Sequence, residues 1–147
     1  MSIFAGTILL ATDGSEEGQL AAATAADLAA KTDSDLHVLT VGLDLPLYEL
    51  PDHPAEFEDV LRENRREAKE VLEREAERIE ESGVAVKETH LREGRADEEI
   101  VEVAEEIGAG LIVMGSRGHG RLRRTLLGSV SESVVRHAHC PVTIVRK

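Results

Sequence analysis

Residues 115–127 contain three glycines and four arginines, the residue types of an anion-binding loop. This stretch follows an apolar run at 111–114 that is typical of a buried strand, and it leads into Gly128-Ser129, where a helical pattern begins. Glycine lets backbone N–H groups approach a ligand closely. The unpaired amides and the dipole of a helix start attract anions. A strand, a glycine-rich basic loop and a helix in this order predict a phosphate-binding cradle.

The elements that would position this loop alternate regularly along the chain. Apolar runs predict strands, and helical spacing of apolar residues predicts helices. The strands are expected at 7–12, 36–41, 84–91, 111–114 and 141–146, and the helices at 16–31, 55–82, 96–107 and 129–138. This alternation predicts an α/β fold, a doubly wound five-stranded parallel sheet of order 3-2-1-4-5 with helices on both faces. We expect one domain over residues 1–147.

In sheets of this kind, ligands bind beyond the carboxyl ends of the strands, at the point where the strand order reverses. The order 3-2-1-4-5 places the end of the first strand beside the end of the fourth. Thr12 and Asp13 follow the first strand, and Gly115 follows the fourth. The sequence therefore predicts an acidic side chain next to the glycine-rich loop.

The loop has the pattern G-x-x-G, nine residues, then G-S, formed by Gly115, Gly118, Gly128 and Ser129. Together with the opening Ile8–Ser15 and the closing His139–Arg146, this pattern resembles the ATP-binding type of the universal stress protein family. The resemblance covers nearly the whole chain. It implies that ATP is the ligand, with Mg²⁺ as the accompanying cation.

The resemblance also implies a role for individual positions. Asp13 would lie near the ribose and phosphates and reach the metal, and the backbone of Val41 would meet the adenine. Glycines 115 and 118 would line the ribose and phosphate path, and residues 128–131 would hold phosphate oxygens. The full set implied for nucleotide binding is Thr12, Asp13, Val41, Met114, Gly115, Arg117, Gly118, His119, Gly128, Ser129, Val130 and Ser131.

Plainer readings exist for several of these residues. The glycines could serve only a tight connection, Asp13 could cap the first helix, and Ser129 could cap the last one. The arginines could form a solvated loop. A metal site could be built from His137, His139 and Cys140, but no matching ligand set stands elsewhere in the sequence. His37 lies in a strand, which favours a packed histidine with a hydrogen-bond partner.

Composition limits the partners. The formal net charge is −12, which repels polyanions and argues against nucleic-acid binding. The same acidity indicates either a salt-adapted host or simply an acidic protein of a GC-rich genome. A single cysteine excludes an internal disulfide. The sequence has no signal-peptide pattern and no apolar run near the ~20 residues of a membrane span, so we expect a cytoplasmic protein without a membrane partner.

The sequence supplies no general base and no nucleophile with a partner. We therefore expect an ATP-binding sensor or switch in the stress response, with hydrolysis at most slow. Two alternatives remain open: a nucleotide-free dimerising interaction module, and an enzyme acting at a nucleotide α-phosphate on the same fold. The unprotected last strand, and the family resemblance, predict a homodimer paired through residues 142–146.

Overall fold

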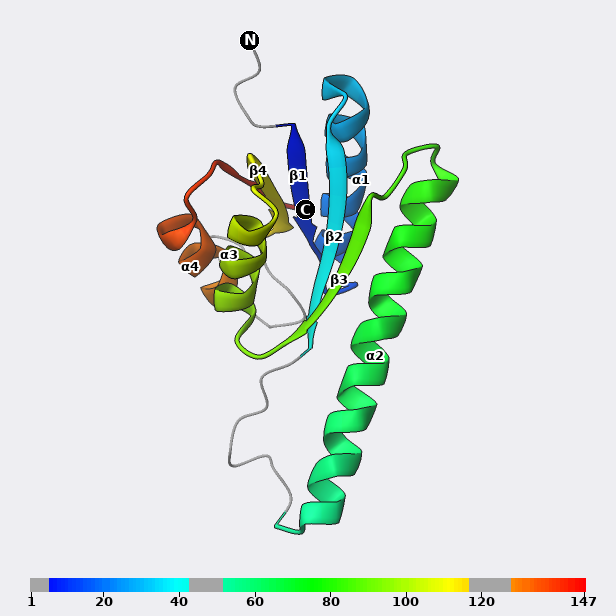
Figure 1. The fold of residues 1–147 in the computed structure, drawn as a ribbon, viewed down its shortest axis with the longest axis vertical. Coiled ribbons are helices and arrows are strands. Elements are labelled where there is room, and N and C mark those ends of the chain that lie inside the picture. The colour runs from blue at the N-terminus through cyan, green and yellow to red at the C-terminus, as the bar shows by residue number, and fades with distance from the viewer. Residues whose placement is uncertain (1–5, 43–51, 117–127) are drawn as a thin grey trace.

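A computed structural model describes residues 6–42, 52–116 and 128–147 of the chain. Strands and helices alternate through these ranges (Figure 1). Their order and bounds are β1 (Thr7–Ala11), α1 (Glu16–Thr32), β2 (Asp35–Gly42), α2 (Pro54–Glu81), β3 (Glu88–Glu93), α3 (Ala96–Glu106), β4 (Leu111–Gly115), α4 (Ser129–His137) and β5 (Val142–Val145).

The strands form one five-stranded sheet of order β3-β2-β1-β4-β5, and every neighbouring pair is parallel. The predicted fold class and strand order are therefore confirmed. β1 lies at the centre, with its Ala11 opposite Leu39 of β2 and Met114 of β4. The strand order reverses between β1 and β4, so their carboxyl ends adjoin.

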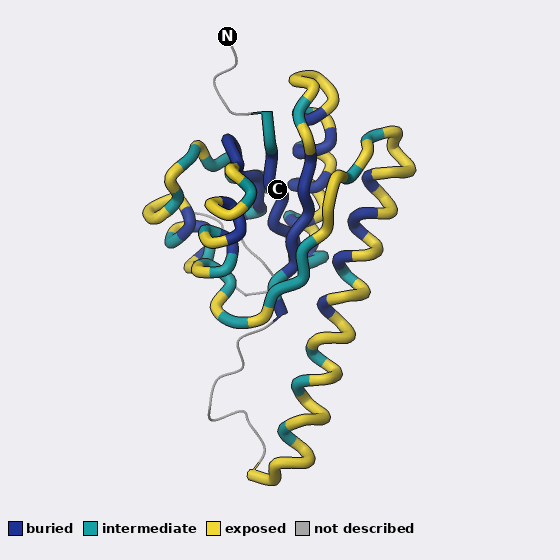
Figure 2. The backbone as a smooth tube through the Cα atoms, viewed as in Figure 1, coloured by how far each residue is buried: buried dark blue, intermediate teal, exposed yellow. Residues whose placement is uncertain are grey.

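Helices cover both faces of the sheet, and each face has its own apolar core. Alternate residues of a strand point to opposite faces. Ile8 and Leu10 of β1 pack with the alanines of α1 and with Leu72 and Ile79 of α2. Leu9 and Ala11 instead join Ile100 and Val103 of α3 and Val134 of α4. The central strands are buried, whereas the amino-terminal half of α2 is mostly exposed and extends past the sheet (Figure 2).

The predicted bounds of the third strand, 84–91, were wrong by several residues. β3 begins at Glu88, opposite His37, and ends at Glu93, opposite Gly42. Val84 and Val86 pack against the core on the way into the strand but form no ladder with β2. Their apolar alternation reflects partial burial alone. Pairing begins only where the Lys87 N–H donates to the Leu36 carbonyl at 2.8 Å.

Candidate functional site

The candidate site lies at the carboxyl ends of β1 and β4. The Thr12 N–H continues the sheet by donating to the Leu39 carbonyl at 3.0 Å, and its side chain is buried. On the other side, the Ser116 N–H donates to the Val145 carbonyl at 2.9 Å. Thr12, Asp13 and Gly115 are thus brought to one edge of the sheet, as the sequence predicts.

The turn after β1 is held by its own side chains. Thr12 Oγ1 accepts the Gly14 N–H at 3.2 Å, and Asp13 Oδ1 accepts the Ser15 N–H at 3.0 Å. Ser15 Oγ accepts the Gly18 N–H at 3.2 Å and is therefore the cap of α1. The reading of Asp13 as the helix cap is wrong, because its carboxylate holds the turn that precedes the cap. Gly14, at φ 79°, supplies the left-handed backbone that this turn requires.

Gly18 allows α1 to approach this turn closely, a role that no pattern in the sequence indicates. A Cβ at position 18 would lie 2.8 Å from Thr12 Oγ1 and 3.0 Å from Asp13 Oδ1. Such distances force one of the groups to move. The glycine in the first turn of α1 therefore sets the positions of two side chains of the candidate site.

Gly115 is also explained by packing against α1. A Cβ there would lie 3.0 Å from the Glu17 Cβ and 3.1 Å from the Glu17 carbonyl carbon. The next residue, Ser116, is buried and donates its hydroxyl to the Glu17 carboxylate. The end of β4 is thus fixed against the first turn of α1.

The start of α4 is joined to the end of β4. The Gly128 N–H donates to the Ser116 carbonyl at 2.8 Å, and the Glu132 N–H donates to the Gly128 carbonyl at 2.9 Å. Gly128 occupies the cap position and provides no side-chain acceptor for the helix. Ser129 is the first helical residue and is exposed, so the reading of Ser129 as the cap is wrong.

Glycine at position 128 is not required by its backbone. Its angles, φ −68° and ψ 159°, are those of ordinary extended structure that any residue adopts. The amides of residues 129–131 precede the first intrahelical donor, and no cap side chain covers them. A helix start of this kind is suited to an anion.

The Ser131 hydroxyl joins the start of α4 to the end of β4. It is fully buried and donates to the Ser116 carbonyl at 2.6 Å, with the Gly128 carbonyl at 3.1 Å. The Ser131 hydroxyl is therefore already hydrogen-bonded within the protein. The Ser131 backbone amide lies at the start of α4.

The remaining predicted residues take different positions. Met114 is buried in the core on the α3 side, so only its backbone lies at the sheet edge. Val41 is half-buried near the end of β2 and packs against the same core. Val130, in the first turn of α4, packs against that core as well. Arg117, Gly118 and His119 lie outside the described residues.

A buried carboxyl of α2 lies near this edge. Glu75 is 2% exposed; Arg78 approaches its Oε1 at 3.6 Å, and its Oε2 has no hydrogen-bond partner within the described part of the chain. Burial raises the pKa of Glu75, and the charge of Asp13 raises it further, while Arg78 and Arg74 oppose this shift. The helix α2 comes close to the turn after β1, because a Cβ at Gly14 would lie 3.1 Å from Val71 Cγ1.

A sequence model of the universal stress protein family matches residues 5–146. A universal stress protein of Methanocaldococcus jannaschii is 39% identical over 140 residues, which are 95% of this chain and 81% of that protein. The structure of UspA from Lactobacillus plantarum matches with a TM-score of 0.81 at 25% identity, covering 95% of this chain and 97% of that chain. This chain therefore belongs to the universal stress protein family.

Two further structural neighbours are described as nucleotide complexes. A universal stress protein in complex with cAMP matches with a TM-score of 0.71 at 28% identity, covering 98% of both chains. The protein from Archaeoglobus fulgidus in complex with dAMP matches with a TM-score of 0.67 at 25% identity, covering 98% of this chain and 99% of that chain.

Within the described ranges of this chain, no helix is long and apolar enough to span a membrane.

Proposed function

We propose that this chain is an ATP-binding universal stress protein that acts as a nucleotide-dependent sensor or switch. The observation that carries the proposal is the start of α4. Gly128 occupies a cap position where its backbone needs no glycine, and as the cap residue it offers no side-chain hydrogen bond to the amides that follow it. A small residue before uncapped amides leaves room for a phosphate to approach them closely.

The turn after β1 supports the same assignment. Thr12 and Asp13 stand at the strand-order reversal, where open α/β sheets bind ligands. We assign Asp13 to the ribose and phosphate end of the nucleotide and the backbone near Val41 to the adenine. Gly115 and the amides of residues 129–131 complete the phosphate path, and Arg117, Gly118 and His119 belong to the same proposed set. The complexes of two neighbours with cAMP and dAMP support an adenine nucleotide as the ligand class.

Mg²⁺ is the proposed companion of the nucleotide. In nucleotide sites this ion usually takes one or two carboxylates together with phosphate oxygens and water. Asp13 supplies one carboxylate at the sheet edge, beside the turn that its Oδ1 holds. Asp13 would hold the ion, and bound Mg²⁺ would neutralise phosphate charge there.

The proposed role is binding without rapid chemistry. Amides at a helix start stabilise phosphate in the ground state as well as in a transition state, and uniform stabilisation does not accelerate a reaction. We therefore expect ATP turnover well below the ~1–10³ s⁻¹ of working enzymes. A multiple-turnover rate within that range would contradict the sensor assignment and favour an enzyme on the same fold.

The test is nucleotide binding by the Gly128→Val variant. Position 128 has extended backbone angles, so valine causes no backbone strain there; because the position is buried, circular dichroism first establishes that the variant is folded. Calorimetry should show ATP binding to the natural chain and an affinity at least ~10-fold lower in the variant. A 10-fold loss of affinity corresponds to about 1.4 kcal/mol of binding free energy. Mass spectrometry of nucleotide released from the freshly purified, denatured protein identifies the natural ligand.

Gly83→Ala is the matched control. Gly83 has φ 95°, so alanine there strains the backbone, but the position has open space around it and precedes β3 at the opposite edge of the sheet. This variant should lower the melting temperature and leave ATP affinity unchanged. Unchanged affinity in folded Gly128→Val overturns the site, and an absence of nucleotide binding by the natural chain favours the dimerising interaction module.

A further inference from the structure

Three side chains with metal-ligand chemistry meet on β2 and β3, in the amino-terminal half of both strands. His37 lies opposite Glu88 in the parallel register, and His90 follows two residues later on β3, opposite Leu39. Residues two apart on a strand share a face, and so do register partners. All three side chains therefore project from the α3 face of the sheet. One ligand atom from each lies within 4.8 Å of the other two.

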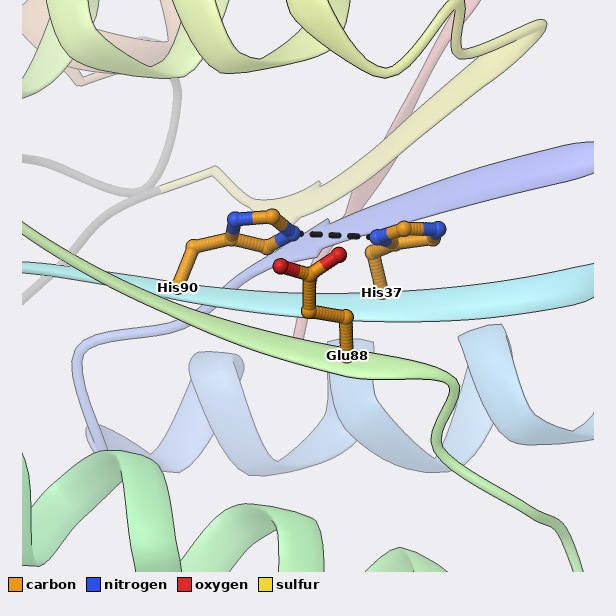
Figure 3. A group of neighbouring side chains, drawn as sticks. All are labelled: His37, Glu88 and His90. Atoms are coloured by element: carbon orange, nitrogen blue, oxygen red, sulfur yellow. Dashed lines mark hydrogen bonds between the residues drawn. The ribbon is translucent and has the colours of Figure 1, made fainter.

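The two imidazoles already face each other across the strands. His37 Nδ1 and His90 Nε2 are 3.0 Å apart, and the rings are inclined by only 18° with centroids 5.3 Å apart. Figure 3 shows the Glu88 carboxylate beside the line that joins the two rings. A tetrahedral Zn²⁺ with bonds of about 2.0–2.1 Å holds two nitrogens roughly 3.3–3.4 Å apart. The ion would replace the hydrogen bond between the two nitrogens, which requires them to separate by a few tenths of an ångström and the rings to turn so that both lone pairs point at the ion.

Charged groups of both strands and of α3 surround the cluster, and metal binding requires its imidazoles in the neutral form. His37 is 7% exposed, and burial lowers its pKa, as does His90. Asp35 and Glu88 raise it and Lys87 lowers it. On the same face, the charge of Arg92 is engaged by Glu99 and Glu106 of α3.

We propose that His37, Glu88 and His90 form a binding site for a divalent transition-metal ion, with Zn²⁺ the best fit. Two imidazole nitrogens and one carboxylate oxygen are a ligand set that zinc accepts, with water in the fourth position. Imidazole selects zinc, copper, nickel or iron over magnesium. The site is therefore chemically distinct from the Mg²⁺ position proposed at Asp13. Exposed Glu88 gives the ion a path from solvent, and the bound ion bridges edge strand β3 to β2.

The test is Zn²⁺ binding to the full chain after treatment with a chelator. Calorimetry should give one ion per chain with micromolar or tighter affinity, and bound Zn²⁺ should raise the melting temperature because it binds the folded state alone. Co²⁺ in the same site should give the intense visible absorption of tetrahedral coordination. His90→Gln and Glu88→Gln should each weaken Zn²⁺ binding at least ~10-fold, a loss of about 1.4 kcal/mol.

The paired variant His137→Gln/His139→Gln is the control, because both histidines are exposed and lie away from the cluster in sequence. It should keep the full stoichiometry and affinity. His90 is half-buried and Glu88 is exposed, so their variants should fold even where a substitution of buried His37 does not. The proposal is overturned if the chain takes up no Zn²⁺ at micromolar concentration. It is equally overturned if binding survives in His90→Gln and Glu88→Gln, or if it disappears in the control variant.

Discussion

Ser131 Oγ lies 2.6 Å from the Ser116 carbonyl oxygen, and this bond joins the first turn of α4 to the end of β4. The same carbonyl accepts the Gly128 N–H at 2.8 Å. Two donors at the start of α4 thus converge on one acceptor at the end of β4. Hydrogen bonds therefore fix the start of α4 relative to the end of β4, and the proposed phosphate-binding amides depend on these bonds for their position.

Replacing Ser131 with alanine should weaken nucleotide binding without removing a ligand contact. The buried Ser116 carbonyl keeps one donor and loses the other, which should cost about 1 kcal/mol of stability. The displaced helix start should bind ATP several-fold more weakly, as measured by calorimetry. Ser133→Ala is the control: its hydroxyl bonds Asp97 Oδ2 at 2.8 Å, away from the loop, so its loss should lower stability alone. Equal affinity in Ser131→Ala and Ser133→Ala would contradict this role.

Gly18→Ala tests the close packing under Asp13. In an ordinary helix this change stabilises by about 1 kcal/mol. Here the new methyl group would meet Thr12 Oγ1 at 2.8 Å, so we expect the gain to be lost and ATP affinity to fall as the Thr12 and Asp13 side chains move. Thermal unfolding and calorimetry measure the two effects. A variant that is more stable and binds ATP normally would show that this approach is not needed.

Local patterns in the sequence predicted the fold well because the buried core strands are visible in the sequence as apolar runs. Leu9 to Ala11 and Leu111 to Met114 are continuous apolar runs, as strands covered on both faces require. Glycine-rich ends of β1 and β4 then located the candidate site once the strand order was inferred. β3 was misplaced because an edge strand with one exposed side carries a weaker apolar signal.

Contacts between distant segments could not be predicted in this way. Glycine at 18 and at 115 is explained by atoms of Thr12 and Glu17, and only the packed structure brings these together. The pairing of His37 with His90 depends on the register of β2 with β3, which a single sequence does not specify. The hydrogen bond from Ser131 to Ser116 likewise joins residues 15 positions apart, and no pattern in the sequence indicates it.

Glu75→Gln should stabilise the protein increasingly as the pH rises. Burial raises the Glu75 pKa above its unfolded value, so the folded state holds the proton more tightly and stability falls as the pH rises from the unfolded pKa through the folded one. Glutamine removes this loss. We expect the melting temperature of the variant to be roughly 2–4 °C higher at pH 8 and little changed near pH 4. In a chain of this length such a shift corresponds to about 1 kcal/mol in the free energy of unfolding.

Glu73→Gln is the control for that change, because Glu73 is exposed on the same helix and its oxygen lies 3.9 Å from Lys69 Nζ. Exposed ion pairs of this kind contribute little to stability. Its melting temperature should stay near that of the natural chain at both pH values. A destabilised Glu75→Gln at pH 8 would mean that the ionised carboxyl is stabilising there.

Potassium chloride should raise the melting temperature between low and molar concentration. The chain has 29 acidic and 17 basic residues, and repulsion among the excess carboxylates is screened as the Debye length falls to about 3 Å at 1 M salt. Exposed Glu80 and Glu81 offer a check, because their joint change to glutamine should flatten the rise. A melting temperature that falls with added salt would reject adaptation to a saline host.

The edge strand β5 should pair with its counterpart in a second copy of the chain. Val142–Val145 is half-buried and pairs with β4 on one side. The Ile112 N–H donates to the Pro141 carbonyl and the Ser116 N–H to the Val145 carbonyl, so the alternation of a parallel ladder turns the Ile144 N–H outward. An exposed row of such groups is a template for pairing.

Ile144→Pro removes this outward donor and should convert a dimer into a monomer in sedimentation experiments at micromolar concentration. Ile144→Val keeps the donor and most of the apolar surface, so it should remain dimeric. Circular dichroism and ATP affinity establish whether each variant is folded. A natural chain that sediments as a monomer would refute the dimer, and a folded Ile144→Pro that stays dimeric would place the interface on another surface.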